Sequence, residues 1–274
     1  MENTIVKVSN VSAGYGKKGS KKPDPQQLVI KDISMNITEG KCVCLLGPNG
    51  CGKTTLLRVI AGIIPSYGTI EIDGKDIKSL KRKEIASYIS FLSQMTQVYF
   101  SYSVYETVMH GRYLHEKSLL SKVTARDKDI VEQTLEALGL LDIAHKQITA
   151  LSGGQLQRVM LARCIAQESP VLILDEPMNH LDMKIQSEFM EYLIKWREKP
   201  IKMDNKSEHL PTIIGVFHDI NMATYIADDI ALLSKGNLLS FGPKDMVLKE
   251  DLLKKAYDFD VAAHLRKFNN SLLF

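Results

Sequence analysis

Residues 47–54 read Gly47-Pro48-Asn49-Gly50-Cys51-Gly52-Lys53-Thr54, and this stretch decides the fold. It fits the pattern G-x-x-x-x-G-K-[ST], with an apolar run at 41–46 before it and a helical pattern at 54–61 after it. Glycines let the backbone curl so that its N–H groups point at an anion, and the N-terminus of the next helix adds positive charge. The sequence therefore predicts a strand, a phosphate-binding loop and a helix in succession.

The chemistry of this loop rests on a few side chains. Lys53 supplies a full positive charge to the β- and γ-phosphates of a nucleotide, and the Thr54 hydroxyl can ligate Mg²⁺. Cys51 faces this positive loop, and such surroundings predict a lowered thiol pKa, with inhibition by alkylation from which bound ATP protects. The predicted ATP-binding residues of the loop are Gly47, Pro48, Asn49, Gly50, Cys51, Gly52, Lys53, Thr54 and Thr55.

Two acidic residues follow a second apolar run. Residues 171–174 are aliphatic, and Asp175 and Glu176 come directly after them. A buried parallel strand delivers its last side chains to the carboxyl edge of the sheet, where ligands bind. Asp175 is therefore expected to hold Mg²⁺, commonly through water, and Glu176 to polarise the attacking water.

Two further polar residues end predicted strands in the same way. His218 follows the apolar run 212–217, and we expect it to contact the γ-phosphate. Gln94 follows a predicted strand at 87–93, and its amide oxygen can reach Mg²⁺. The chain after Gln94 leads into a long helical pattern, so this residue is a candidate link between the nucleotide and a partner.

A glycine-rich stretch lies about a hundred residues after the phosphate loop. It reads Leu151-Ser152-Gly153-Gly154-Gln155 and stands directly before a helical pattern at 155–167. A serine hydroxyl and glycine amides at a helix N-terminus form an anion site. The sequence thus predicts a second group of residues suited to phosphate.

The remaining pattern predicts an α/β fold with a mainly parallel sheet, because strands alternate with helices. Strands are expected at 4–11, 28–37, 41–46, 68–73, 87–93, 171–174 and 212–217, and helical segments at 54–61, 104–141, 155–167 and 184–197. The polar, proline-containing segments 16–27 and 198–211 are expected to be loops.

Composition limits the class of protein. The 274 residues carry a net charge of +3, too small to indicate nucleic acid as the main partner. No apolar run approaches the roughly 18–20 residues of a membrane-spanning helix, and the N-terminus lacks the features of a secretion signal. Four cysteines fit a reducing compartment, with Cys42 and Cys44 expected as core thiols. The protein is therefore expected in the cytosol.

With these motifs in this order, the sequence resembles the ATP-binding-cassette (ABC) ATPases over essentially its whole length. The resemblance implies a P-loop NTPase nucleotide-binding domain, with a RecA-like core, an antiparallel β subdomain and an α-helical subdomain. It implies one domain over 1–274, with the helical subdomain at roughly 97–158 and a C-terminal tail at roughly 245–274. Met178 departs from the family pattern, which usually has threonine or serine there.

The resemblance also implies a head-to-tail dimer with ATP between two copies of the chain. The stretch Ser152-Gly153-Gly154-Gln155 of one subunit would close on the γ-phosphate held by Lys53 of the other. Tyr15 would stack on adenine, and Asp182 would lie at the dimer seam.

Finer matches point to a subgroup. The segments 77–80, 85–89, 103–108 and 218–223, with Gly111-Arg112-Tyr113, look like the ATPases of importers for iron–siderophore, heme and cobalamin. The resemblance implies a peripheral subunit at the cytoplasmic face of the cell membrane that energises uptake through membrane permease subunits. An external substrate-binding protein would take part indirectly.

Two other functions stay open from the sequence: the ATPase of a zinc or manganese importer, and a soluble ABC ATPase of iron–sulfur assembly type. The interval between the loop and residue 152 carries no sustained heptads, which argues against the coiled coil of DNA-repair forms. The aromatic residues Tyr99, Phe100, Tyr102 and Tyr105 fit either core packing or a groove for a short helix of a membrane subunit.

Overall fold

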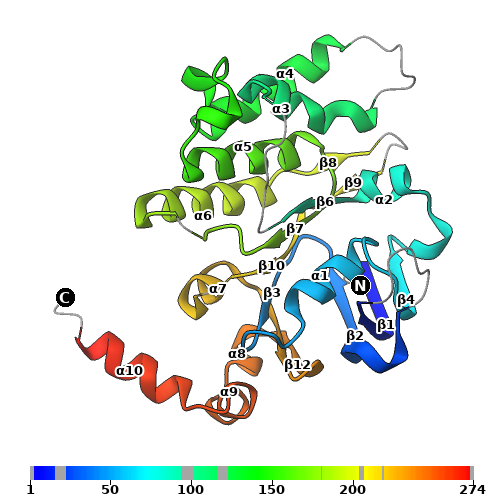
Figure 1. The fold of residues 1–274 in the computed structure, drawn as a ribbon, viewed down its shortest axis with the longest axis vertical. Helices are drawn as coiled ribbons and strands as arrows, with labels where there is room; N and C mark the ends of the chain where they lie inside the picture. The colour runs from blue at the N-terminus through cyan, green and yellow to red at the C-terminus, as the bar shows by residue number, and fades with distance from the viewer. Residues whose placement is uncertain are drawn as a thin grey trace. The chain divides into compact units, whose positions relative to one another are not determined.

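The computed structural model describes residues 3–15, 23–93, 101–115, 123–179, 181–203, 207–217 and 219–271. The chain divides into two compact units. The first combines Met1–Ser79 with Ile214–Phe274, and the second is Leu80–Ile213. Figure 1 traces the chain from its N-terminus to its C-terminus.

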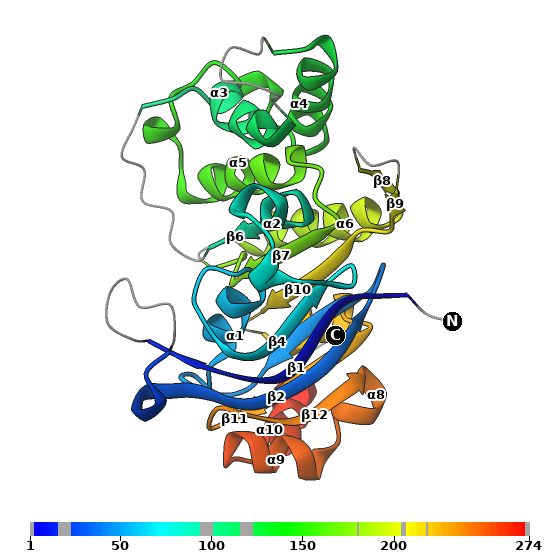
Figure 2. The same ribbon diagram turned by 90° about the vertical axis from the view of Figure 1, so that its right-hand side faces the viewer.

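The first unit contains an antiparallel sheet in the strand order β2-β1-β4-β5. Figure 2 shows β1, β2 and β4 running side by side. Apolar residues of neighbouring strands face each other, as in the pairs of Val6 with Ile72 and Val8 with Ile70, and all four are buried. The strands are β1 (Thr4–Gly14), β2 (Leu28–Thr38), β4 (Tyr67–Ile72) and β5 (Lys75–Asp76).

The same unit contains a second group of strands that positions the phosphate loop. β3 (Cys42–Leu46) runs parallel to β11 (Asp229–Ser234), and β12 (Asn237–Pro243) is antiparallel to β11. Every residue of β3 and β11 is buried, as expected for strands covered on both faces. The helices are α1 (Lys53–Ile60), α7 (Ile220–Ile226), α8 (Lys244–Val247), α9 (Glu250–Tyr257) and α10 (Val261–Ser271), with short 3-10 turns at Pro25–Gln27 and Ile77–Ser79.

The second unit is mainly helical. β6 (Ile89–Leu92) and β7 (Val171–Asp175) form a parallel pair. The boundary between the units falls within β10 (Thr212–Val216), because the second unit ends at Ile213. In both ribbons α3 (Val104–Met109) and α4 (Ala125–Ala137) pack on one side of α5 (Gly153–Ala166) (Figures 1 and 2). The other elements are α2 (Arg82–Tyr88), α6 (Met183–Arg197), β8 (Ile201–Lys202), β9 (Glu208–His209) and 3-10 turns at His110–His115, Leu141–Ile143 and Ile148–Ala150.

Three differences from the expected elements have simple causes. The strand expected at 87–93 begins at Ile89, because residues 82–88 form α2. The segment 198–211 was expected to be a loop, but within it β8 and β9 pair as a short antiparallel ribbon. The long helical pattern at 104–141 is divided among α3, a 3-10 turn, α4 and a further 3-10 turn, and residues 116–122 lie outside the described ranges.

A buried arginine ties the helical unit together. Arg112, only 4% exposed, donates from Nε to Asp127 Oδ1 at 2.9 Å and from Nη1 to Glu168 Oε2 at 2.8 Å and to the Ala166 carbonyl oxygen at 2.6 Å. Asp127 also accepts from Thr124, the N-cap residue of α4. Burial opposes the ionisation of Asp127, but its hydrogen bonds with Thr124 and Arg112 outweigh burial and lower its pKa.

No helix in the parts of the chain that the structure describes is long and apolar enough to cross a membrane.

We expect Arg112→Met to lower the free energy of unfolding by about 3–5 kcal/mol at pH 7, because it leaves the buried Asp127 carboxylate and the part-buried Glu168 carboxylate without the Arg112 cation. The stabilisation from ionised Asp127 is present above its unfolded-state pKa and is lost as the pH falls through its depressed folded-state pKa. The gap between wild type and variant should therefore narrow below about pH 4. Urea unfolding at pH 7 and pH 3.5 measures both effects.

The matched control is Arg126→Met. Arg126 also pairs with Glu168, at 3.3 Å, but is 65% exposed, so its loss should cost less than about 1 kcal/mol. Equal destabilisation by the two substitutions would contradict the importance of the buried pair.

Candidate functional site

The backbone between β3 and α1 follows a path that only glycine accepts at its ends. Gly47 and Gly52 have φ angles of 146° and 104°. A Cβ on Gly47 would overlap the Leu233 carbonyl oxygen, and one on Gly52 would overlap a methyl group of Ile30. A Cβ on Gly50 would meet nothing within 4 Å, so the crown of the loop is open. The predicted strand, loop and helix are present, and the loop has the form of an anion cradle.

Lys53 lies across the base of this cradle. Its Nζ donates to the carbonyl oxygens of Gly47 at 2.7 Å and Pro48 at 3.0 Å. Gly52 is the N-cap residue of α1 and has no side chain to cap the first turn. Such helix N-termini offer backbone N–H groups and a positive dipole end to an anion. The loop therefore brings the Lys53 charge and a helix N-terminus to one place.

Cys51 differs from its expected chemistry. Its side chain is 3% exposed, and burial raises the pKa of its thiol against the lowering effects of the Lys53 charge and of backbone hydrogen bonds. The expectation of a lowered pKa is wrong, because the neighbouring cation is visible in the sequence and the burial is not. Cys42 and Cys44 are buried, as expected for core thiols.

Tyr15 lies on the same unit as the loop. The residue is 46% exposed, and its hydroxyl accepts a hydrogen bond from Arg58 Nη1, on α1, at 3.3 Å. An exposed ring near α1 suits stacking on a base, and this assignment stays a prediction.

The acidic pair lies in the second unit, at the end of β7. Asp175 is buried, and Glu176 follows with a φ of 54°, in the left-handed region that non-glycine residues seldom occupy. Asn179 Nδ2 donates to Glu176 Oε2 at 2.7 Å. The unusual backbone and this bond together hold the carboxylate in one direction. The sequence motifs did not indicate this contact between Asn179 and Glu176.

Residues 152–155 form the N-terminus of α5. Ser152 is the N-cap residue: its Oγ accepts from the Gln155 N–H at 3.3 Å, and Gln155 Oε1 accepts from the Ser152 N–H at 3.1 Å. This is a capping box. A Cβ on Gly153 would meet nothing within 4 Å, and one on Gly154 would lie 3.3 Å from a Leu181 methyl carbon. The predicted helix N-terminus is confirmed, and its role towards phosphate stays a prediction.

Asp182 caps the next helix. Its Oδ1 accepts from the Ile185 N–H at 2.9 Å at the start of α6. This local bond explains an aspartate at this position, and a place at a dimer seam stays a prediction. Gln94, Tyr99, Phe100 and His218 lie outside the described residues.

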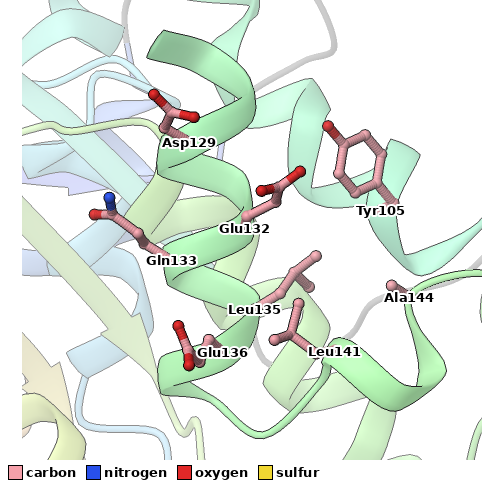
Figure 3. A pocket seen from close by; sticks show the side chains of 8 residues that line it. All are labelled: Tyr105, Asp129, Glu132, Gln133, Leu135, Glu136, Leu141 and Ala144. Carbon is pink, nitrogen blue, oxygen red and sulfur yellow. The ribbon is translucent and has the colours of Figure 1, made fainter. Parts of the chain in front are cut away.

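The helical unit contains a pocket of about 440 Å³ between α3, α4 and the turn after α4. We call it the α3–α4 pocket. Figure 3 shows the Tyr105 ring and the Glu132 carboxylate facing each other across it. Burial, and then the Glu132 charge, raise the pKa of Tyr105. The lining is Tyr105, Asp129, Glu132, Gln133, Leu135, Glu136, Leu141 and Ala144.

The α3–α4 pocket thus combines an apolar floor with an acidic rim. Leu135 is fully buried, Leu141 is partly exposed, and three carboxylates stand on α4. Of the four aromatic residues after Gln94, Tyr105 lines this pocket. Tyr102 is partly exposed and packs edge-on against the His110 ring at 4.7 Å between centroids.

We expect Cys51 to react with iodoacetamide at pH 7.5 more slowly than a free cysteine, at least about tenfold, because its thiol is buried and its pKa is raised. Peptide mass spectrometry of the folded protein measures the rate, and urea-unfolded protein supplies the reference. Labelling of folded protein at the free-thiol rate would contradict the buried position.

Comparisons with curated proteins find close relatives. The chain is 34% identical over 258 residues to the petrobactin import ATP-binding protein YclP of Bacillus subtilis strain 168, and covers 94% of both chains. It is also 33% identical over 235 residues to the iron(3+)-hydroxamate import ATP-binding protein FhuC of the same organism. That alignment covers 85% of this chain and 84% of FhuC.

Comparisons with solved structures also find ABC proteins. An inward-facing ABC transporter of metal-chelate type matches with a TM-score of 0.75 and 28% identity, over 94% of this chain and 90% of that one. The ATP-binding cassette MJ0796, a dimer bound to ADP and Pi, matches with a TM-score of 0.70 and 26% identity, over 87% of this chain and 98% of that one. The expected fold, an α/β nucleotide-binding domain of the ABC type, is confirmed.

A family profile matches residues 30–179, from β2 through the phosphate loop and residues 152–155 to the acidic pair. The profile is that of the ABC transporter family. With a match over more than half of its length and relatives above 30% identity, this chain is a member of the ABC transporter family and carries its ATP-binding cassette.

Proposed function

We propose that this protein is the ATP-hydrolysing subunit of an importer that takes up an iron chelate, such as a siderophore or heme, or a cobalamin-type substrate. The observation that carries the proposal is the glycine cradle with Lys53 at its base. The relatives support the choice of importer, because FhuC is named for iron(3+)-hydroxamate import and a structural neighbour is of the metal-chelate type.

The first step is binding of the ATP phosphates in the loop. A phosphate draws the Lys53 ammonium away from the neutral carbonyls of Gly47 and Pro48, because charge-assisted bonds are the stronger ones. The N–H groups at the start of α1 add to the attraction. The exposed Tyr15 ring is then available to adenine.

The residues also fit Mg²⁺. The Thr54 hydroxyl, the Asp175 carboxylate and the Gln94 amide are hard oxygen donors, which Mg²⁺ prefers in small numbers beside substrate phosphates and water. When bound, Mg²⁺ neutralises part of the phosphate charge.

Hydrolysis then needs a base and a partner for the γ-phosphate. Glu176 would polarise the attacking water, and the hydrogen bond from Asn179 orients its carboxylate. His218 would contact the γ-phosphate at the end of its strand.

A second copy of the chain completes the site in our proposal. Ser152 accepts a hydrogen bond within its own helix, so its hydroxyl proton stays available to donate to a phosphate of the partner copy. Gly153 and Gly154 leave room for close approach of that phosphate. Gln155 holds the cap, and Asp182 would lie at the seam. The MJ0796 cassette is a dimer bound to ADP and Pi, which supports a dimer of two copies of this chain.

The membrane partner is a permease in our proposal, and the α3–α4 pocket is the place that receives it. The apolar floor suits one face of a short helix, and the three carboxylates of the rim suit basic residues flanking that face. The subunit would then sit at the cytoplasmic face of the membrane, and an external binding protein would act through the permease alone.

We expect Glu176→Gln to bind MgATP with near wild-type affinity, to lose at least about 100-fold in turnover, and to accumulate as a dimer, because only the water-polarising carboxylate is removed. A phosphate-release assay and gel filtration with ATP test this. Lys53→Ala is the contrasting variant and should lose affinity for ATP in calorimetry. Wild-type turnover in Glu176→Gln would contradict the assignment.

The docking proposal predicts that Glu132→Lys with Glu136→Lys lowers recovery of a polytopic membrane protein with the tagged subunit by at least about fivefold, because both changes reverse the rim charge. ATP hydrolysis by the isolated subunit should stay unchanged. Glu191→Lys, an exposed residue of α6, is the control for charge alone. Undiminished recovery with the double variant would overturn this use of the pocket.

A further inference from the structure

We propose that helix α9 is part of the nucleotide site: Tyr257, at its last turn, is a positioning residue that holds Gly47 and so sets the shape of the phosphate loop. The proposal rests on the proposed function, because the loop must bind ATP for its shape to matter. It adds a residue that lies 210 positions away from the loop in sequence.

The contact is a hydrogen bond from the Gly47 N–H to Tyr257 Oη, at 3.1 Å. The parallel ladder between β3 and β11 ends with the pair Leu46 and Leu232, so Gly47 is the first residue beyond it. A part-buried backbone N–H that leaves a ladder requires another acceptor. The Tyr257 hydroxyl is that acceptor.

Gly47 is also a partner of Lys53. Its carbonyl oxygen accepts from Lys53 Nζ at 2.7 Å, while its N–H donates to Tyr257. The residue is confined further by the Leu233 carbonyl, which leaves no space for a side chain. When phosphate draws the ammonium away, the bond to Tyr257 remains. Tyr257 therefore fixes the start of the loop during the exchange that binding requires.

Helix α9 is anchored firmly enough to act as a support. Leu253 and Ala256 are buried, and Ser234 Oγ donates to the Ala256 carbonyl oxygen at 3.0 Å. Helix α9 packs against β11 and β12, and Figure 2 shows the three elements next to one another. Burial raises the pKa of Tyr257, so its hydroxyl stays neutral throughout the physiological range. The support is thus independent of pH under working conditions.

Cys51 lies on the same inner side of the loop. Its Sγ is 2.8 Å from the place where a Gly47 side chain would begin, and its charge would contribute to the raised pKa of Tyr257. Gly47, Cys51 and Tyr257 thus lie together on the inner side of the loop. Loss of the Tyr257 hydroxyl should therefore loosen Gly47 and make Cys51 more accessible, even without nucleotide.

The test uses the purified full-length chain and Tyr257→Phe, which removes the hydroxyl and keeps the ring. Loss of one hydrogen bond predicts a KM for MgATP raised about 3–10-fold, with kcat within about twofold of wild type. Iodoacetamide should label Cys51 at least about threefold faster than in wild type. Thermal melting tests whether the fold is retained.

Tyr225→Phe is the control, because Tyr225 lies in the same unit, on α7, with its side chain 64% exposed. It should leave KM, kcat and Cys51 labelling unchanged. Ser234→Ala, which removes an anchor of α9 without touching the loop, should raise KM in the same direction and by less than Tyr257→Phe.

Unchanged KM and unchanged Cys51 labelling in Tyr257→Phe would overturn the proposal. So would a lowered melting temperature with both values unchanged, since the Tyr257 hydroxyl would then contribute only to the stability of the fold. Failure of the proposed function gives a different result: wild type would not hydrolyse ATP, and Lys53→Ala would not alter nucleotide affinity. The rate of Cys51 labelling reports on the hydrogen bond between Gly47 and Tyr257 in either case.

Discussion

The first unit depends on the way the backbone leaves β3 at Gly47. The strand is buried and paired to its last residue, and the chain must then turn at once without a Cβ to avoid the Leu233 carbonyl. The turn lets the Lys53 ammonium donate to two loop carbonyl oxygens. Helix α1 then begins after Gly52, which has no side chain to cap the helix. The proposed binding of phosphate and Mg²⁺ and the proposed support from α9 all depend on this one backbone geometry.

In the second unit the comparable constraint is the buried Arg112 cluster. It joins the 3-10 turn at 110–115 to the start of α4 and to the end of α5, three segments that are separate in sequence. Since residues 152–155 form the N-terminus of α5 and the α3–α4 pocket lies between α3 and α4, this cluster supports both proposed contact surfaces of the unit. A charged core is unusual in a helical layer, and its hydrogen bonds explain why it is tolerated here.

Much of the site could be predicted from short motifs, for a physical reason. The loop 47–54, the acidic pair after β7 and the N-cap at Ser152 are local constructions, in which neighbours in sequence hydrogen bond to each other or share one turn. Short motifs do not predict elements that are stabilised mainly by contacts between residues far apart in the sequence. The sequence patterns do not predict the strands β11 and β12 or the helices α8 to α10, and they predict a loop where β8 and β9 pair.

The sequence by itself determined the class of the protein and its local chemistry, since glycine spacing, an apolar strand and a following lysine suffice to specify a phosphate loop. Tertiary structure decided the environment of those residues. It buried Cys51 and so raised a pKa that the nearby cation alone would lower, it joined Asn179 to Glu176, and it brought Tyr257 to Gly47. Burial and long-range hydrogen bonds depend on distances through space, which sequence spacing does not report.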